Sequence, residues 1–217
     1  MIPDIDWNRV ALVTIDMQRD FVIGRSAAAV KGTQKVVPRV REALDLFRKW
    51  HRPIIHVVRL YLQDGSNAEP CRRDGIAAGK VVVAPYSKGA EIIEDLLPDA
   101  SSALDANLLL KGKIQQWTAH EWVMFKPRWG AFYQTPLEDH LRCQAINSLI
   151  FCGCNFPNCP RASLYEASER DHRLALLADA TSKFSPTAKP ELEGIGANVW
   201  TVLDLANKGA ANALMDL

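Results

Sequence analysis

The sequence lacks any apolar run that approaches the roughly 18 residues needed to cross a bilayer. It also lacks an excess of one charge, because 26 Lys and Arg residues stand against 25 Asp and Glu residues. Charges that nearly cancel give nucleic acid or an anionic membrane little to attract, so we expect neither as the main partner. Apolar residues make up 48% of the chain, enough for one substantial core, and we expect a single domain over residues 1–217.

Cysteine is scarce, and its number is odd. The first residues, MIPDIDWNRVALVTIDMQ, lack the basic start, long apolar stretch and small-residue cleavage site of a signal peptide. We therefore expect a cytoplasmic protein with reduced thiols, and the odd count and the length also argue against a disulfide scaffold. The five cysteines are Cys71, Cys143, Cys152, Cys154 and Cys159.

Signatures of a cofactor are missing as well. Three cysteines fall within 152–159, but structural zinc usually needs a fourth Cys or His, typically from a second spaced pair, and no such pair exists. No G-x-G-x-x-G follows the first apolar run, and the sequence has no P-loop lysine motif. We expect neither a metal nor a nucleotide cofactor.

What the sequence does have is an alternation of apolar runs with helical spacing along its whole length. Unbroken apolar runs are typical of strands buried on both faces. Six strands are expected at 10–15, 51–60, 121–125, 147–152, 173–178 and 198–203. Helices are expected at 33–50, at 91–97, from Thr135, at 160–171, near 187–195 and from Asp204. This alternation predicts an α/β fold whose parallel strands are joined by right-handed crossovers.

Two connections are too long to be simple loops. Segments 61–88 and 98–120 have weak periodicity, and we expect them to wall or cover a pocket, as a lid or an oligomer contact. The helix expected from Thr135 has two start signals, with Pro136 at the first helical position and Glu138 completing a capping box.

Ionisable residues follow three of the expected strands, at the edge where parallel sheets bind ligands. They are Asp16, Lys126 and the segment that ends at Cys159. Because Pro160 suits a first helical turn, Cys159 is expected to cap a helix, where the helix dipole and Lys126 would lower its pKa. Asp16 would accept the thiol proton. Spacing alone leaves non-catalytic interpretations open. Asp16 would then be a loop or cap residue and Lys126 a solvated side chain. The cysteines, above all Cys152 and Cys154, would be small core residues.

Three segments together resemble the isochorismatase-like cysteine hydrolase superfamily, in its order, from about residue 9 to residue 203. They are IDMQRDF (15–21), FKPRWGAFYQTPLEDHLR (125–142) and CGCNFPNCPRASLYEASERDHRLALLADATS (152–182). The resemblance implies a three-layer α/β/α fold with a mainly parallel, Rossmann-like sheet, here of six strands. It also implies an Asp-Lys-Cys triad, and the matching positions are Asp16, Lys126 and Cys159.

The turn before the nucleophile carries two further implications of the resemblance. A non-proline cis peptide would join Cys154 to Asn155, and the backbone amides of Asn155 and Cys159 would stabilise an oxyanion. This segment departs from the common family pattern at Phe156-Pro157 and at Pro160, so one wall of the pocket is expected to differ.

The family's branches are separated by motifs that are absent here. Nicotinamidases carry an Asp-x-His pair after the second strand, together with a further His, as metal ligands. Asp64 has no such partner, and His56 lies within an expected strand, where a packed core histidine is the better interpretation. The resemblance thus favours the metal-free amidohydrolase branch, which hydrolyses the C–N bond of a small amide, carbamoyl or ureido compound through a thioester. Two alternatives stay open: an isochorismatase-type vinyl-ether hydrolase, which needs no cysteine nucleophile, and a non-catalytic binding or scaffold protein.

Features that bear on the substrate and the assembly are weaker. Arg72, Arg73 and Lys80 would suit a carboxylate at the pocket mouth, or would form a solvated cluster. The aromatic residues near the expected rim, taken as pocket candidates beside Arg72, are Trp129, Phe132 and Phe156. The expected partners are a small-molecule substrate and further copies of the chain in a homo-oligomer. The apolar tail 207–217 would suit such an interface, or would form a last helix that covers the sheet.

Overall fold

Seven strands form one sheet in the computed structural model, which describes residues 2–26 and 28–213. The strands are β1 (Val10–Ile15), β2 (Ile54–Val58), β3 (Gln115–Thr118), β4 (Glu121–Phe125), β5 (Ser148–Gly153), β6 (Arg173–Thr181) and β7 (Ala197–Trp200). Their order across the sheet is β3-β4-β2-β1-β5-β6-β7, and every neighbouring pair is parallel except β3 with β4. The predicted α/β class with a mainly parallel sheet is confirmed.

The count of strands differs from the prediction by one edge strand. All six expected strands are present, and β3 is additional, antiparallel to β4 and inside the segment that was expected to be irregular. Its sequence, QQWT, has no apolar run to signal a strand, because an edge strand is not buried on both faces. The last strand also ends earlier than expected, at Trp200, because Val202 already begins a helix.

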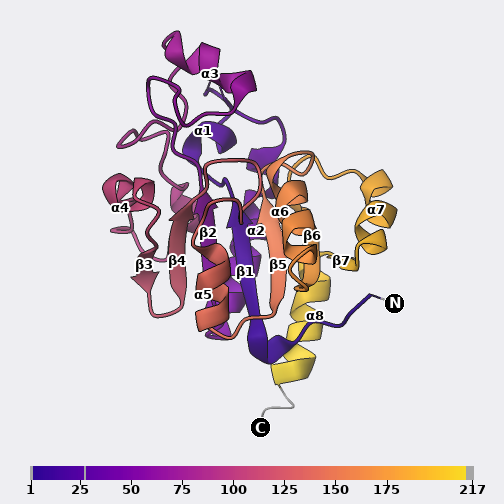
Figure 1. Ribbon diagram of the computed structural model, residues 1–217. Coiled ribbons are helices and arrows are strands. Elements are labelled where there is room, and N and C mark those ends of the chain that lie inside the picture. The colour runs from indigo at the N-terminus through magenta and orange to yellow at the C-terminus, as the bar shows by residue number, and fades with distance from the viewer. Residues whose placement is uncertain (1, 27, 214–217) are drawn as a thin grey trace.

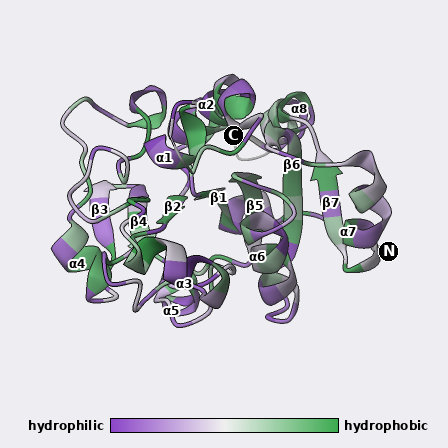
Figure 2. Cartoon of the chain, turned by 90° about the horizontal axis from the view of Figure 1, so that it is seen from above, coloured by the Kyte–Doolittle hydropathy of each residue, from purple (hydrophilic) through white to green (hydrophobic). Residues whose placement is uncertain are grey.

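Helices cover both faces of the sheet. They are α1 (Arg19–Val22), α2 (Thr33–Lys49), α3 (Pro70–Ala77), α4 (Ala106–Leu110), α5 (Leu137–Cys143), α6 (Cys159–Ser168), α7 (Lys189–Gly194) and α8 (Val202–Ala213). Short 3₁₀ turns lie at Trp7–Arg9, Glu94–Leu96 and Pro186–Ala188. Figure 2 shows the sheet between α2 and α8 on one side and α5 and α6 on the other. This arrangement is a three-layer α/β/α fold.

The alternation of side chains along β1 explains the two cores. Leu12 faces the layer that contains Leu44 and Phe47 of α2, whereas Val13 faces the layer that contains Leu141 of α5 and Leu164 of α6. Successive strand residues point to opposite faces, so a strand covered on both sides must be apolar at every position. All six residues of β1 are indeed buried.

Two predicted helix features are wrong. Segment 91–97 contains only a 3₁₀ turn, because Ile92 pairs with Gln18 in an isolated β-bridge and Ile93 donates its amide to the Met17 carbonyl. The capping box at Thr135 does not form either. Pro136 is the N-cap of α5, one residue later than expected, and Glu138 instead pairs with Arg170 at 2.9 Å.

The carboxyl ends of the parallel strands meet at one edge of the sheet, and α1 and α3 lie over this edge (Figure 1). Segment 61–88, one of the two long connections, supplies α3. The C-terminal stretch continues as α8 to residue 213, and the rest of the expected interface tail lies outside the described residues. No helix in the described ranges combines the length and apolar character required for a membrane span.

Candidate active site

Asp16 is the first residue after β1, and its backbone turns sharply there. Its amide still donates to the Val57 carbonyl of β2 at 2.9 Å, but its φ of 52° lies in the left-handed region. Asp tolerates that region better than most residues, although it remains a strained conformation for a side chain with a Cβ. The turn leaves the carboxylate buried at the end of the sheet, with 4% of the residue exposed.

Lys126 follows β4 and reaches the same point from two strands away. Its side chain is fully buried, and Nζ lies 2.9 Å from Oδ2 of Asp16 and 3.3 Å from the Arg128 carbonyl. The other carboxylate oxygen, Oδ1 of Asp16, has no hydrogen-bond partner within the described part of the chain. A buried ion pair is stable only when both charges are kept together, so removal of either partner is costly.

Cys159 is brought to this pair by a turn after β5 that requires glycine. Gly153 has a φ of 121°, and a Cβ built on it would lie 2.3 Å from the Ile15 carbonyl oxygen. No other residue fits so close a backbone approach. The chain then crosses the end of β1, where the Cys154 amide donates to Ile15 O at 2.8 Å. Cys159 begins α6 as its first residue, not as its N-cap, which is Asn158.

The electrostatic setting of Cys159 differs from the expectation of an acidic thiol. Burial raises the pKa of the Cys159 thiol to about 12, and the neighbouring Asp16 charge acts in the same direction, outweighing the opposite effects of Lys126 and Arg59. The Cys159 thiol is therefore neutral near pH 7, with the Asp16 carboxylate beside it as a hydrogen-bond acceptor. Such a pair has the composition of an activated nucleophile and its general base.

The two backbone amides expected to stabilise an oxyanion lie beside this cluster. Within residues 2–26 and 28–213, the amides of Asn155 and Cys159 donate to no acceptor. The turn between them is closed by other contacts, since Asn158 N donates to Asn155 O at 3.0 Å and Phe156 N donates to Ser182 O at 2.8 Å. Two unused donors, one in the turn and one at the N-terminus of α6, are suited to developing negative charge.

The expected cis peptide between Cys154 and Asn155 is absent, because no peptide bond in the described ranges is cis. That prediction is wrong for this structure. Gly153, with its positive φ, supplies the change of direction that brings the chain over Ile15.

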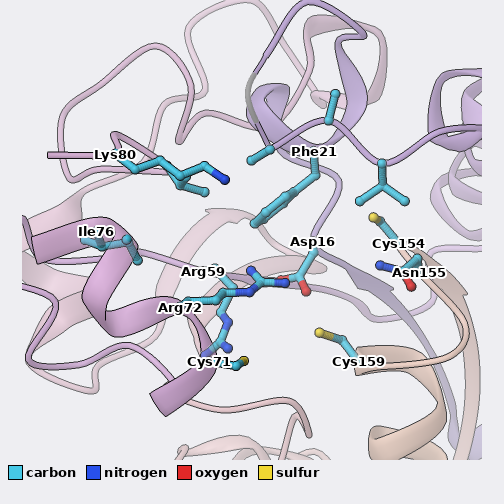
Figure 3. Close-up of a pocket in the computed structure, with 15 residues that line it drawn as sticks. Asp16, Phe21, Arg59, Cys71, Arg72, Ile76, Lys80, Cys154, Asn155 and Cys159 are labelled. Atoms are coloured by element: carbon cyan, nitrogen blue, oxygen red, sulfur yellow. The ribbon is translucent and has the colours of Figure 1, made fainter. Parts of the chain in front are cut away.

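A cavity of about 350 Å³ opens over Asp16, Asn155 and Cys159. Cavities of this size hold small organic ligands. Figure 3 shows Cys154, Asn155 and Cys159 on one side of it, and residues of α3 and the segment after α3 on the opposite side. Those on the far side are Cys71, Arg72, Gly75, Ile76 and Lys80.

Arg59 is a member of the cavity wall that the sequence analysis did not single out. It follows β2, is 1% exposed, forms an ion pair with Glu69, and donates to the Lys126 carbonyl at 3.0 Å. Gln18 fixes its backbone, because the Gln18 side chain accepts from Arg59 N and donates to Arg59 O, both at 2.7 Å. Its position directly after the second strand was the available signal, since ligand groups gather at strand ends.

Of the four predicted pocket residues, only Arg72 lines the cavity. Trp129 lines a neighbouring hollow with Asn158 and Arg161, and its ring lies 5.0 Å from the Arg72 guanidinium. Phe156 packs edge-on against Phe184 at 5.1 Å, and Phe132 is buried in the core on the α5 and α6 side. None of these three aromatic residues is among those that line this cavity.

His56 is fully buried, as predicted for a core histidine. Its ring joins Thr14 Oγ1 at 2.7 Å and Glu121 Oε1 at 2.7 Å, and Arg48 completes the cluster at 2.7 Å from the same carboxylate. Cys152 is buried without exposure, and Cys154 lines the cavity with 2% exposure. Within the part of the chain that the structure describes, no three His, Cys, Asp or Glu side chains are grouped so as to hold a metal ion.

A comparison with protein-family models agrees with this geometry. The model described as "Isochorismatase domain" matches residues 10–105 and 107–193, which include Asp16, Lys126 and Cys159. The chain belongs to the isochorismatase family. The resemblance drawn from the three sequence segments is thereby confirmed.

Relatives within the isochorismatase family carry different activities in their names. A probable inactive nicotinamidase of Arabidopsis thaliana is 28% identical over 205 residues, covering 94% of this chain and 91% of that protein. A ureidoacrylate amidohydrolase of Methylobacterium radiotolerans is 24% identical over 193 residues, covering 81% of this chain and 67% of that protein. An isochorismatase family protein from Desulfovibrio vulgaris superposes with a TM-score of 0.79 at 28% identity, covering 93% of this chain and 98% of that one.

Proposed function

We propose that the chain is a cysteine hydrolase that cleaves the C–N bond of a small amide, carbamoyl or ureido compound through a thioester on Cys159. The observation that carries this proposal is that Asp16 and Cys159 line one cavity while the buried Lys126 is paired with Asp16 directly behind it. Lys126 and Asp16 form a buried ion pair at 2.9 Å, and the carboxylate also faces the thiol. The small cavity fits a small-molecule substrate.

In the acylation step, the sulfur of Cys159 attacks the substrate carbonyl while Asp16 takes the thiol proton. A thiol with a pKa near 12 needs such a base at the moment of attack, because almost no thiolate is present at neutral pH. The amides of Asn155 and Cys159 receive the oxyanion, and one such donor is typically worth about 3 kcal/mol. Asp16 then gives its proton to the leaving nitrogen, the C–N bond breaks, and a thioester remains.

Deacylation reverses these roles with water. Asp16 takes a proton from water, the resulting hydroxide equivalent attacks the thioester carbonyl, and the proton returns to the departing sulfur. Lys126 does not transfer the proton in this scheme. Its ammonium stays paired with Oδ2 of Asp16 at 2.9 Å and holds the carboxylate in position for both steps.

The choice of a C–N bond is supported by Cys159 at the family's nucleophile position and by the ureidoacrylate amidohydrolase among the relatives. The relative named as a probable inactive nicotinamidase makes nicotinamide a necessary member of any substrate panel.

The test measures ammonia released from small amides, ureido acids, carbamoyl amino acids, biuret-like compounds and nicotinamide, with and without a chelator. Wild type is compared with Cys159→Ala and with Cys71→Ala, a change to an exposed cysteine that lines the cavity and is not part of the cluster. We expect release by wild type and Cys71→Ala, and a loss of at least about a thousandfold in Cys159→Ala. Residual turnover of Cys159→Ala near the wild-type rate rules out the thioester. A second arm follows an acyl adduct on Cys159 by mass spectrometry after acid quench.

A further inference from the structure

We propose that the substrate is anionic: an amide, carbamoyl or ureido compound with a carboxylate at the end remote from the scissile carbonyl, held by Arg72 and Lys80. This inference deepens the proposed function and depends on the same site. The charges that line the cavity carry it.

Four ionisable side chains other than cysteine line the cavity: Asp16, Arg59, Arg72 and Lys80. Two of them are already neutralised, because Asp16 pairs with Lys126 and Arg59 pairs with Glu69. Among the residues that the structure describes, Arg72 and Lys80 form no ion pair with any carboxylate. The cavity therefore carries two uncompensated positive charges, both on the α3 side.

The Arg72 guanidinium is held in place by neutral partners. Its Nη1 donates to the Tyr61 hydroxyl at 2.9 Å, and the group lies 5.7 Å from the Tyr61 ring and 5.0 Å from the Trp129 ring. Tyr61 is itself fixed, because its hydroxyl donates to Glu69 at 2.8 Å. A guanidinium has five N–H donors, and this one uses a single donor within the described protein, so a pair remains for a carboxylate. Its orientation is set before any ligand binds.

Lys80 stands three residues beyond the end of α3, and its amide donates to the Gly75 carbonyl at 3.0 Å. Figure 3 shows its side chain extending into the cavity, on the side away from Cys159. An exposed ammonium is flexible and hydrated, so it acts as a point charge that attracts an anion to the mouth, whereas Arg72 supplies directed hydrogen bonds.

Most of the other residues that line the cavity are apolar. Phe21, Val30, Ile76 and Val82 are among them. A polar group in the middle of the substrate would have few partners there, and a buried polar group without partners is costly. The lining therefore suits a substrate with a scissile carbonyl at one end, a short hydrocarbon spacer and a carboxylate at the other end.

The first experiment measures binding and does not require turnover. Cys159→Ala is titrated by calorimetry with ureido acids that contain one to four methylene groups, and with the methyl ester of each acid as a neutral isostere. We expect the best acid to bind at least about tenfold tighter than its ester, the effect of one well-placed charge interaction. Adding Arg72→Gln should remove most of this preference, and adding Lys80→Gln should reduce it about threefold.

The matched control is Arg73→Gln. Arg73 is the next residue of the same helix, but its side chain donates to the Ala68 carbonyl and does not line the cavity. Equal binding of acids and esters to the Cys159→Ala protein would overturn the anionic substrate, as would an equal loss of preference in the Arg72→Gln and Arg73→Gln variants. Failure of both kinds of ligand to bind would also overturn it.

The kinetic arm separates this inference from the proposed function. In the active enzyme, Arg72→Gln should raise KM for the preferred acid at least about tenfold and leave kcat within about threefold, because the carboxylate is bound equally in ground and transition states. Hydrolysis that depends on Cys159 but ignores the carboxylate refutes only the anionic substrate. Preferred binding of the acid without any hydrolysis refutes only the proposed function.

Discussion

Two buried polar clusters lie on neighbouring strands of this sheet, and they differ in how fully the carboxylate of each cluster is hydrogen-bonded. The first joins Thr14, His56, Glu121 and Arg48 across β1, β2, β4 and α2. Both oxygens of the Glu121 carboxylate are bonded, Oε1 to His56 and Arg48, and Oε2 to Arg48 at 3.1 Å. Burial alone would raise the Glu121 pKa, but the hydrogen bonds from His56 and Arg48 outweigh it and lower the pKa to about 2. Both oxygens of this carboxylate are therefore engaged by protein donors.

The second cluster begins two residues beyond Thr14, at Asp16, the first residue after β1. One oxygen of its carboxylate meets Lys126 at 2.9 Å, and the other has no hydrogen-bond partner in the described ranges. It faces a cavity and a thiol, whereas Glu121 faces neither. A buried acceptor without a partner is rare in proteins, because it carries a desolvation penalty. The comparison shows that incomplete satisfaction, more than burial or charge, distinguishes the candidate catalytic carboxylate from the structural one.

The largest effect is expected from separation of the Asp16–Lys126 pair. Lys126→Met leaves a buried carboxylate without its cation, which should cost about 3–5 kcal/mol in the free energy of unfolding. Urea denaturation measures this loss. The double variant Asp16→Asn/Lys126→Met removes both charges and should recover most of the stability, although not the turnover. A double variant as unstable as the single one would show that the loss comes from packing.

The next largest effect is expected on the pH dependence of stability, through Glu121. Its folded pKa of about 2 lies below the ordinary value of 4.5, so the ionised form is stabilised by folding. This contribution is fully present above about pH 4.5 and is lost as the pH falls towards 2, and it is worth about 3 kcal/mol. Glu121→Gln should therefore lower the free energy of unfolding at pH 7. The difference between the variant and wild type should shrink as the pH falls. A gap that stays constant down to pH 3 would contradict the lowered pKa.

A smaller effect, in free energy, is expected on the reactivity of Cys159. Because the Asp16 charge raises the thiol pKa, Asp16→Asn should increase alkylation of Cys159 at pH 8 about tenfold, which corresponds to one pKa unit. Turnover should disappear in the same variant, since the general base is lost. Mass spectrometry of the labelled peptides separates Cys159 from the exposed Cys71 and Cys143. Slower alkylation in Asp16→Asn would mean that the carboxylate activates the thiol in the resting enzyme.

The smallest effect on the free energy of unfolding is expected at an exposed ion pair, which serves as a reference for the buried pairs. Arg142 and Asp139 lie 2.7 Å apart on α5, with about three quarters of each side chain exposed (76% and 74%). Solvent screens such a pair, so Asp139→Asn should change the free energy of unfolding by less than about 0.5 kcal/mol. A loss as large as that of Glu121→Gln would remove the contrast between the buried and exposed pairs.

The sequence was sufficient for the parts of the fold that depend on continuous apolar runs. The six parallel strands and α2 follow from periodicity, and Asp16, Lys126 and Cys159 meet because each follows a strand of one parallel sheet. The start of α8 also had a local signal that was overlooked. Thr201 and Asp204 bond reciprocally, the Asp204 amide to Thr201 Oγ1 and the Thr201 amide to Asp204 Oδ2, as in a capping box.

Other features depend on contacts between distant segments and left no local pattern. The polar edge strand β3 forms only because β4 lies beside it. The Arg59–Glu69 pair joins the end of β2 to the residue before α3, and neither residue type is expected in a core. The pKa of Cys159 rises because the whole cluster is buried, which a helix start and a nearby lysine in the sequence did not reveal.

The position of α3 separates two kinds of variation. The candidate catalytic groups come from three strand ends far apart in the chain, so any change there must respect the whole sheet. The two cations proposed to select the substrate lie within one short stretch, Arg72 on α3 and Lys80 three residues after its end, over the sheet edge. Exchange of this stretch between relatives is therefore a direct route to new specificity.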